Sequence, residues 1–345
     1  MPRDATIAPL VLSSWIYFWR LATGRGIPFS QYFPNAGVTM SSPETSSAAK
    51  ATAKSGTKSS VLVHNAYGKS GVRLTKVIRH EGYQELKELT ANIQLEGGFE
   101  GSYLEGDNSQ IIATDSMKNI VYIMAAEHPL TTLESFAQDL ALHFLKTYSH
   151  VTEATVHLVE DLWLRIPTDG KPHPHAFVSA GNEKRIASVV ADRESLSLQS
   201  GIDNLVVAKT TDSQFWGFIR DQYTTLPEVR DRIMATSIEA SWLYKAESKK
   251  DTESIDFNKN YETIRKIILD VFATQHSLAV QQTLYDMGEA VLAAVSDIEE
   301  ISITMPNQHR ITFNLEPFGM KNQNEIFFPI DEPFGLISGT IKRGA

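Results

Sequence analysis

Two short segments in the first half of the sequence carry residues that could bind a small anion or move protons. Lys69 stands between two glycines at the end of an apolar stretch, in the motif Tyr67-Gly68-Lys69-Ser70-Gly71. Thr114 and Asp115 stand where a helix is expected to begin. The backbone N–H groups of a helix start, together with the positive end of the helix dipole, favour an anion. The same residues also suit plainer roles, as a solvated hairpin lysine and a helix cap.

Two segments in the second half combine aromatic and polar side chains. Residues 213–218 read Ser-Gln-Phe-Trp-Gly-Phe and are surrounded by polar residues. We therefore expect Phe215 at a partly open surface, where its ring can stack on a planar group. Asn307 and His309 end a predicted strand, and residues two apart on a strand share a face.

A metal site is the alternative for one further segment. His173 and His175 are two residues apart in a proline-rich stretch. A stable site needs further ligands, and no third ligand of matching spacing is evident. We therefore expect no metal here.

Composition narrows the class of protein. The 345 residues are 42% apolar and 21% charged, the profile of a soluble globular protein. With 32 basic and 41 acidic side chains the formal charge is -9, so we expect no nucleic-acid partner, although a locally basic pocket for an anion is compatible with this charge. No apolar run beyond residue 40 reaches the ~20 residues that span a bilayer, so we expect no membrane partner. The chain has no cysteine, which excludes disulfides, thiolate metal ligands and a cysteine nucleophile.

Residues 1–59 are expected to lie outside the folded part. Residues 7–19 form a short apolar run after Arg3, as in a secretory segment, but Asp4 is out of place in one. The following Ser-, Thr-, Ala- and Lys-rich run cannot pack a core. We expect a disordered leader or tail in which Met40 is the true start and the upstream residues are a mis-called extension. A targeting segment is the alternative.

The elements that position the polar segments follow from hydrophobic periodicity. Residues 61–67 and 72–80 predict a strand pair broken at Gly68 and Gly71, and residues 84–94 continue the sheet. A turn at residues 97–98 precedes the rest of this half.

Helices and a long strand complete each half. The first helix is expected near Thr114, and a second follows a capping box formed by Thr131 and Glu134. Residues 151–166 then predict a long strand. In the second half, two apolar helical faces again precede a strand, and their residues are Tyr261, Ile264, Ile268, Val271 and Phe272, then Val280, Leu284, Met287, Val291 and Val295.

A sequence repeat relates the two halves of the chain. Residues 151–158 align with residues 298–305, apolar on apolar and polar on polar, at an offset of 147 (298 minus 151). Each segment follows a predicted helix pair, which favours a duplicated unit. Short turns between strands favour antiparallel pairing. We predict an α+β fold of two tandem units, residues 60–196 and 197–345, each an antiparallel four-stranded sheet with two helices packed on one face.

In this order the polar segments resemble the urate oxidase (uricase) family. The resemblance covers about residues 61–336, and its motifs are Tyr-Gly-Lys at Lys69, Ala-Thr-Asp-Ser at Thr114, the loop 171–177, the string 213–226, Val280-Gln281 and Asn307-Gln308-His309. It implies two tandem tunnelling-fold (T-fold) units in each chain. It also implies a homotetramer whose active sites lie between subunits.

The family's site residues map onto this chain one by one. The resemblance implies that Phe215 stacks on urate, that Arg232 clamps it and that Gln281 reads its opposite edge. An aromatic face, a guanidinium and an amide suit a planar anion rich in hydrogen-bond acceptors. Arg230 lies two residues before Arg232, which makes this assignment depend on the count from Leu226. The other residues placed against urate are Thr114, Asp115, Leu226, Val280 and Asn307.

The resemblance also implies a reaction without metal, flavin or haem. Dioxygen and water convert urate to 5-hydroxyisourate and hydrogen peroxide. Lys69, Thr114 and His309 form a proton relay with Lys69 as the general base, while Asn307 and Thr114 hold dioxygen and then the attacking water. Thr114 and Asp115 come from the neighbouring subunit, so relay and clamp lie on different chains and a lone subunit is expected to be inactive.

The expected cellular location and the alternative functions rest on fewer residues of the sequence. Eukaryotic members commonly end in a Ser-Lys-Leu-type peroxisomal signal, whereas this chain ends Arg343-Gly344-Ala345, which favours a cytoplasmic enzyme. The alternative function is another T-fold purine- or pterin-binding protein without oxidase activity. T-fold members that hydrolyse GTP use zinc held by Cys and His, and this chain has no Cys. The presence of all three relay residues argues against an inactive homologue.

Overall fold

A computed structural model describes residues 60–344, and its contacts divide the chain into Met1–His64 and Asn65–Ala345. The expectations for residues 1–59 lie outside the described residues. Residues 60–66 contain no helix or strand. Within 60–344, no helix combines the length and the apolarity that crossing a membrane requires.

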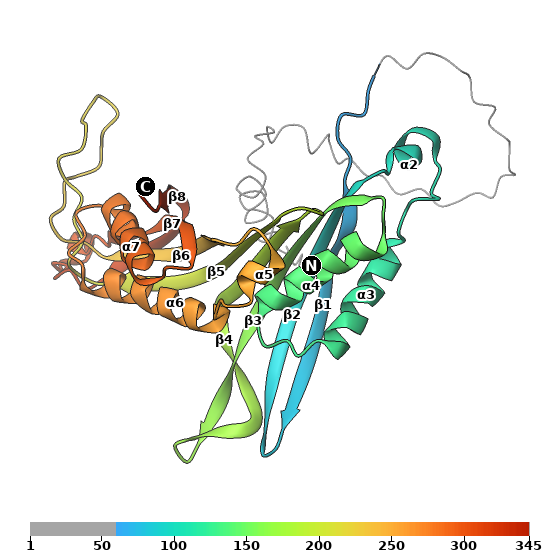
Figure 1. Ribbon diagram of the computed structural model, residues 1–345. Coiled ribbons are helices and arrows are strands. Elements are labelled where there is room, and N and C mark those ends of the chain that lie inside the picture. Colours follow the sequence, from blue (N-terminus) through green and yellow to red (C-terminus); the bar gives the residue numbers. More distant parts are fainter. Residues whose placement is uncertain (1–59, 345) are drawn as a thin grey trace, which may run out of the picture. The chain divides into compact units, whose positions relative to one another are not determined.

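The unit Asn65–Ala345 alternates pairs of strands with groups of helices (Figure 1). Its first half contains β1 (Tyr67–His80), β2 (Tyr83–Gly97), α2 (Glu100–Glu105), α3 (Thr114–Glu127), α4 (Leu133–Thr147), β3 (Val151–Thr168) and β4 (Lys171–Ala191). Its second half contains β5 (Leu196–Lys209), β6 (Met234–Tyr244), α5 (Lys249–Thr252), α6 (Phe257–Thr274), α7 (Val280–Ala294), β7 (Ile298–Thr312), η2 (Glu316–Phe318) and β8 (Phe327–Lys342).

Within residues 60–344, all eight strands belong to one antiparallel sheet in the order β1 to β8. Each strand pairs with the strand before it in sequence. Short turns join β1 to β2, β3 to β4 and β4 to β5, whereas long loops join β5 to β6 and β7 to β8, and helices connect β2 to β3 and β6 to β7. The two predicted four-stranded sheets are therefore joined, since Ala191 at the end of β4 pairs with Leu196 at the start of β5. The predicted α+β fold class is confirmed, and the boundary between residues 196 and 197 stays a proposal.

The helices cover the sheet half by half. Helix α3 packs against β1, and α4 packs against β3 and β4 (Figure 1). In the second half, α6 packs against β5, and α7 packs against β7 and β8. Each long helix is amphipathic, and its apolar stripe is the face that is buried, for example Phe136, Leu140 and Phe144 of α4.

Two arginines provide structural evidence for the duplication. Arg193 follows β4 and donates to the carbonyl oxygen of Val151, the first residue of β3 (3.2 Å). Arg343 follows β8 and donates to the carbonyl oxygen of Ile298, the first residue of β7 (3.5 Å). The two acceptors are 147 residues apart (298 minus 151), the offset of the sequence repeat. The duplication predicted from one strand is therefore seen again in these two arginine bonds, each of which joins the end of one half to the start of its third strand.

Three local expectations are wrong. Residues 61–66 are not a strand, and Gly68 and Gly71 do not break β1, which runs on from Tyr67. Helix α4 is capped by Thr132, whose hydroxyl accepts from the Ser135 N–H (3.3 Å), rather than by a Thr131–Glu134 box.

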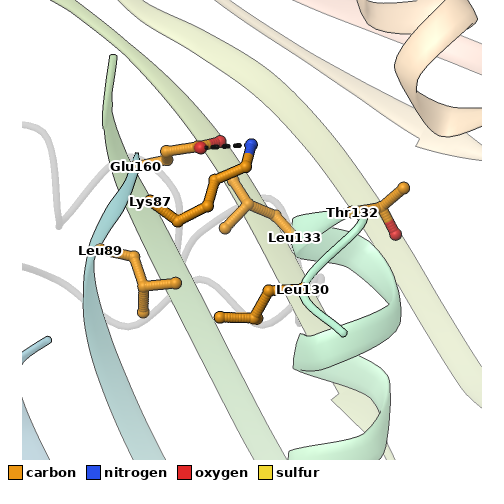
Figure 2. A pocket seen from close by; sticks show the side chains of 6 residues that line it. All are labelled: Lys87, Leu89, Leu130, Thr132, Leu133 and Glu160. Atoms are coloured by element: carbon orange, nitrogen blue, oxygen red, sulfur yellow. Dashed lines mark hydrogen bonds and ion pairs between the residues drawn. The ribbon is translucent and has the colours of Figure 1, made fainter. Parts of the chain in front are cut away.

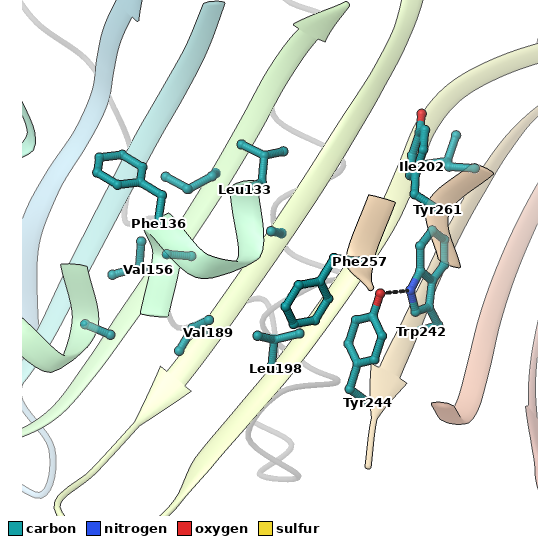
Figure 3. Close-up of a cluster of buried hydrophobic side chains, with 14 of the residues drawn as sticks. Leu133, Phe136, Val156, Val189, Leu198, Ile202, Trp242, Tyr244, Phe257 and Tyr261 are labelled. Carbon is teal, nitrogen blue, oxygen red and sulfur yellow. Dashed lines mark hydrogen bonds between the residues drawn. The ribbon is translucent and has the colours of Figure 1, made fainter. Parts of the chain in front are cut away.

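The Glu134 side chain is absent from the cap because it faces the sheet. Its carboxylate is fully buried and accepts hydrogen bonds from Arg185 of β4 (3.0 and 3.2 Å). Burial opposes the charge of Arg185, but the Glu134 and Glu160 carboxylates raise its pKa above the ordinary value. The hydrophobic core continues from α4 to α6 and includes Phe136, Leu198 and Phe257 (Figure 3).

Replacing Arg185 should destabilise the fold far more than replacing an exposed arginine. Arg185→Leu leaves the buried Glu134 carboxylate unpaired, which we expect to lower the free energy of unfolding by about 3–5 kcal/mol. The control is Arg73→Leu, because Arg73 also pairs with a glutamate, Glu88, but its side chain is 66% exposed. Urea unfolding at one protein concentration measures both variants. Equal losses would contradict the importance assigned to the buried pair.

Candidate active site

The strand around Lys69 is held on both sides of this residue. At Gly68, an added Cβ atom would lie 1.8 Å from the carbonyl oxygen of Ile93, so β1 and β2 run too close there for any side chain. Directly after Lys69, β1 carries a bulge. Gly71 in this bulge has φ 71°, and its N–H donates to the buried amide oxygen of Asn92 on β2 (2.8 Å). Close packing and the bulge together fix where the Lys69 side chain leaves the strand.

Thr114 and Asp115 are the first two residues of α3. The N-cap is Ala113, which offers no side-chain cap, so the first N–H groups of the helix remain available to an anion. Asp115 is exposed, and the Lys118 ammonium lowers the pKa of its carboxyl group, with a smaller contribution from Lys69. Lys69 and the start of α3 are therefore electrostatic neighbours. The expected helix start at Thr114 is confirmed, but neither Thr114 nor Asp115 is the cap.

The hydroxyl of Tyr67 ties β1 to the segment before α3. It accepts a hydrogen bond from the Ile112 N–H (2.7 Å) and donates one to the Ile112 carbonyl oxygen (3.2 Å). Lys69 lies two residues after Tyr67, and Thr114 lies two residues after Ile112. One group of candidate residues, Lys69, Thr114 and Asp115, is thus gathered where β1 begins and α3 begins.

Phe215 and Arg232 form the centre of a second group. The backbone of Phe215 pairs with Val229 (2.9 and 3.0 Å), and the Arg232 N–H donates to the Ser213 carbonyl oxygen (2.9 Å). These bonds bring the Arg232 guanidinium carbon to 5.2 Å from the centre of the Phe215 ring. The Phe218 ring stacks on Phe215 at 4.8 Å and 13°, so in this structure another flat ring occupies one face of Phe215.

The geometry separates Arg232 from its neighbour Arg230. Arg230 is exposed and lies over the Trp216 ring at 4.2 Å. Arg232 is half-buried, burial lowers its pKa, and its Nε atom is buried without a hydrogen-bond partner among the described residues. A buried cation with an unused N–H group is suited to a planar anion. The structure therefore favours Arg232 as the clamp.

The start of α7 lies beside the Phe215 segment. Gln214 donates its N–H to the Ser277 carbonyl oxygen (2.7 Å), three residues before Val280. Val280 is buried, whereas Gln281 is exposed and able to reach a ligand. Leu226 is also exposed, on the loop that follows Phe215.

Asn307 and His309 lie near the end of β7, next to the strand that follows Arg232. Asn307 pairs with Thr236 of β6, and β6 begins at Met234, two residues after Arg232. The Thr236 hydroxyl is buried without a partner among the described residues. The second group consists of Phe215, Leu226, Arg232, Val280, Gln281, Asn307 and His309, which lie between β5 and β6, at the start of α7 and near the end of β7.

The two groups are far apart within one chain. Six strand positions separate β1 from β7, and at about 4.8 Å per strand this is roughly 29 Å along the sheet. His309 accordingly lies with the clamp residues, and not with Lys69 and Thr114, the other two residues expected in the relay. A single chain does not bring the predicted relay together.

Comparison with known proteins identifies the family of this chain. The family model described as Uricase matches residues 65–190 and 198–338. The chain is 41% identical to a uricase of Arthrobacter globiformis over 86% of this chain and 94% of the relative, and 40% identical to one of Aspergillus flavus over 81% and 96%. The chain belongs to the uricase family. The crystal structure of the Arthrobacter globiformis uricase matches with a TM-score of 0.77 at 40% identity, over 83% of this chain and 96% of that one.

Two residues that hold the backbone near the uricase-family motifs were not predicted to have this role. Asn92 is 5% exposed and holds the bulge after Lys69, while Tyr67 ties that strand to the start of α3. Alternation gave no signal for Asn92, because Leu89, Ala91, Ile93 and Leu95 form the apolar face of β2 and Asn92 lies on the opposite face. The Tyr67 bond links residues 45 positions apart and has no local sequence signal.

Other features of this uricase-family chain do not add to the site. A small pocket between β2, β3 and the start of α4 is lined by the Lys87–Glu160 ion pair (2.7 Å) and includes no residue of either group (Figure 2). The rings of His173 and His175 on β4 are 4.5 Å apart. Within residues 60–344, no group of three His, Asp or Glu side chains could hold a metal ion.

Proposed function

We propose that this chain is a urate oxidase, in which dioxygen and water convert urate to 5-hydroxyisourate and hydrogen peroxide at a site shared by two subunits. The observation that carries the proposal is the half-buried Arg232 guanidinium beside the Phe215 ring, within a chain of the uricase family. Atoms and electrons balance: urate gains one oxygen atom from water and loses two electrons, and dioxygen takes up two electrons and two protons.

The second group binds the substrate. Urate is a flat anion, so its ring stacks on Phe215 while the Arg232 guanidinium donates hydrogen bonds to its acceptor atoms. Burial of Arg232 strengthens this attraction, because the surroundings screen charge less than water does. Gln281 offers both a donor and an acceptor to the opposite edge of the ring. Leu226 and Val280 add backbone and packing contacts.

Lys69, Thr114 and His309 move the protons. Removing a proton makes urate electron-rich enough to reduce dioxygen directly, so the protein needs to supply only position and proton transfer. Lys69 acts as the general base through the Thr114 hydroxyl, and His309 completes the relay. Asn307 and Thr114 hold dioxygen and then the attacking water above the ring. Metal, flavin and haem have no part in this reaction scheme.

The site is completed by a second subunit. The distance of roughly 29 Å along the sheet between Lys69 on β1 and His309 on β7 is too large for one urate molecule to contact both. Lys69, Thr114 and Asp115 of one subunit therefore meet the clamp, Asn307 and His309 of another. A homotetramer with such shared sites accounts for both groups, and a lone subunit is inactive.

Chelation should leave the activity intact. Purified protein is mixed with urate in air-saturated buffer, with and without EDTA, and the urate absorbance is followed together with the peroxide formed. We expect urate to disappear and one peroxide to form per urate in both samples, since no step uses a metal.

The possible results separate the proposals. Binding of urate without its oxidation would favour the alternative, a T-fold purine-binding protein that is not an oxidase. Activity that EDTA abolishes and added metal restores would contradict the metal-free scheme while leaving the substrate assignment in place.

A further inference from the structure

The Tyr67 side chain is fixed at both ends. Its ring packs edge-on against Phe99, with centroids 4.7 Å apart, and Phe99 is 1% exposed. Its hydroxyl makes the two bonds to Ile112, as acceptor from the N–H (2.7 Å) and as donor to the carbonyl oxygen (3.2 Å). Using both backbone groups of one residue fixes Ile112 in orientation as well as in distance.

Tyr67 and Ile112, which these hydrogen bonds join, lie at matching positions before the relay residues Lys69 and Thr114. Tyr67 and Lys69 are two residues apart on β1 and share a face of the strand. Ile112 is two residues before Thr114, where α3 begins. Because Gly68 is packed against the Ile93 carbonyl oxygen, the strand between Tyr67 and Lys69 has little freedom to rotate.

Helix α3 has other ties to β1, and they lie further along the helix. The Tyr122 hydroxyl donates to the Arg73 carbonyl oxygen (2.7 Å), and the Lys76 ammonium donates to the Ala125 carbonyl oxygen (2.7 Å). These bonds hold the middle and the end of α3 when the Tyr67 bond is removed. Loss of the Tyr67 hydroxyl should therefore loosen the start of the helix and leave the rest of it docked.

We propose that Tyr67 is a positioning residue for the proton relay, which keeps the Lys69 ammonium and the Thr114 hydroxyl within reach of each other by holding Ile112. This inference rests on the proposed function of Lys69 and Thr114. Tyr67 does not touch urate; it acts on the alignment of two groups whose proton transfer depends on distances to within about 1 Å.

The test is Tyr67→Phe, which keeps the ring and its contact with Phe99 and removes only the hydroxyl. We expect kcat to fall by roughly 10- to 100-fold, because a misplacement of about 1 Å can have an effect of that size. The dissociation constant of urate should change much less, because Phe215, Arg232 and Gln281 lie in the other group and keep their positions. Tyr122→Phe is the matched control, since it removes a hydroxyl bond between the same helix and strand; kcat should stay at the wild-type value. In a Lys69→Met background, Tyr67→Phe should cause no further loss.

A readout that needs no activity separates this inference from the proposed function. Hydrogen exchange of the backbone amides of residues 112–118 should be faster in Tyr67→Phe, with residues 119–127 unchanged. Unchanged exchange and unchanged kcat would overturn the positioning role. The same fold-loss with and without Lys69 would also overturn it, because the loss would then be structural. A wild-type protein that does not oxidise urate contradicts the proposed function alone, and hydrogen exchange still decides whether Tyr67 holds the start of α3.

Discussion

Lys69→Met should lower kcat for urate oxidation by about 10²–10⁴-fold, the usual contribution of a positioned general base. Methionine matches the length of the lysine stem but cannot carry a proton, so the relay loses its base. The dissociation constant of urate should change little, because Phe215, Arg232 and Gln281 bind the ring from a different part of the fold. Stopped-flow turnover and equilibrium binding under anaerobic conditions measure the two quantities separately.

A second lysine on the same strand is the control for this prediction. Lys76 donates to the backbone carbonyl oxygen of Ala125 near the end of α3 (2.7 Å) and is distant from Thr114. Lys76→Met should lower the stability of α3 and leave kcat at the wild-type value. If Lys69→Met kept full turnover, or if the two variants lost it equally, Lys69 would not be the base.

Periodicity was sufficient for the long elements. Helix α4 and the strands β3 and β7 were predicted because their apolar residues recur at 3.6 or 2 positions over many residues. The alignment of residues 151–158 with 298–305 predicted the duplication, and the burial of the two strands follows the same order. Local patterns of this kind depend only on neighbouring residues.

Features that depend on tertiary contacts were predicted wrongly or not at all. Gly68 was taken as a break in the strand, whereas the close approach of Ile93 from β2 requires a glycine inside a continuous strand. Glu134 was taken as part of a helix cap, but Arg185 of β4 binds its carboxylate. Joining of the two sheets depends on pairing of β4 with β5 across the short turn at residues 192–195, where Asp192 accepts from the N–H groups of Glu194 and Ser195, and this hairpin was not predicted.

The site residues came from motif resemblance, and the structure adds their grouping. It favours Arg232 over Arg230 by burial and by the contact with Phe215. It also places His309 with the clamp, on a strand far from Lys69. Which residues act in the reaction stays a prediction, and the grouping makes that prediction testable.

Two inactive variants should restore activity to each other when their subunits are mixed. Lys69→Met lacks the base, and Arg232→Gln lacks the cation that holds urate, so each homo-oligomer is expected to be nearly inactive. In a randomly mixed oligomer, a site is intact when it takes Lys69 from one kind of subunit and Arg232 from the other. When equal amounts of the two subunits assemble at random, half of the sites have an intact Lys69 and half of those have an intact Arg232. About a quarter of the wild-type activity is therefore expected.

The control mixture is Lys69→Met with Thr114→Ala. Both substitutions lie in the group formed by β1 and α3, so every shared site still lacks one of the two residues and no activity should return. Subunits are mixed by co-expression with two different tags, and doubly tagged oligomers are purified before the assay with urate. A recovery of about a quarter in the first mixture and none in the second is the predicted result. Doubly tagged Lys69→Met/Arg232→Gln oligomers without activity would contradict a site shared between subunits.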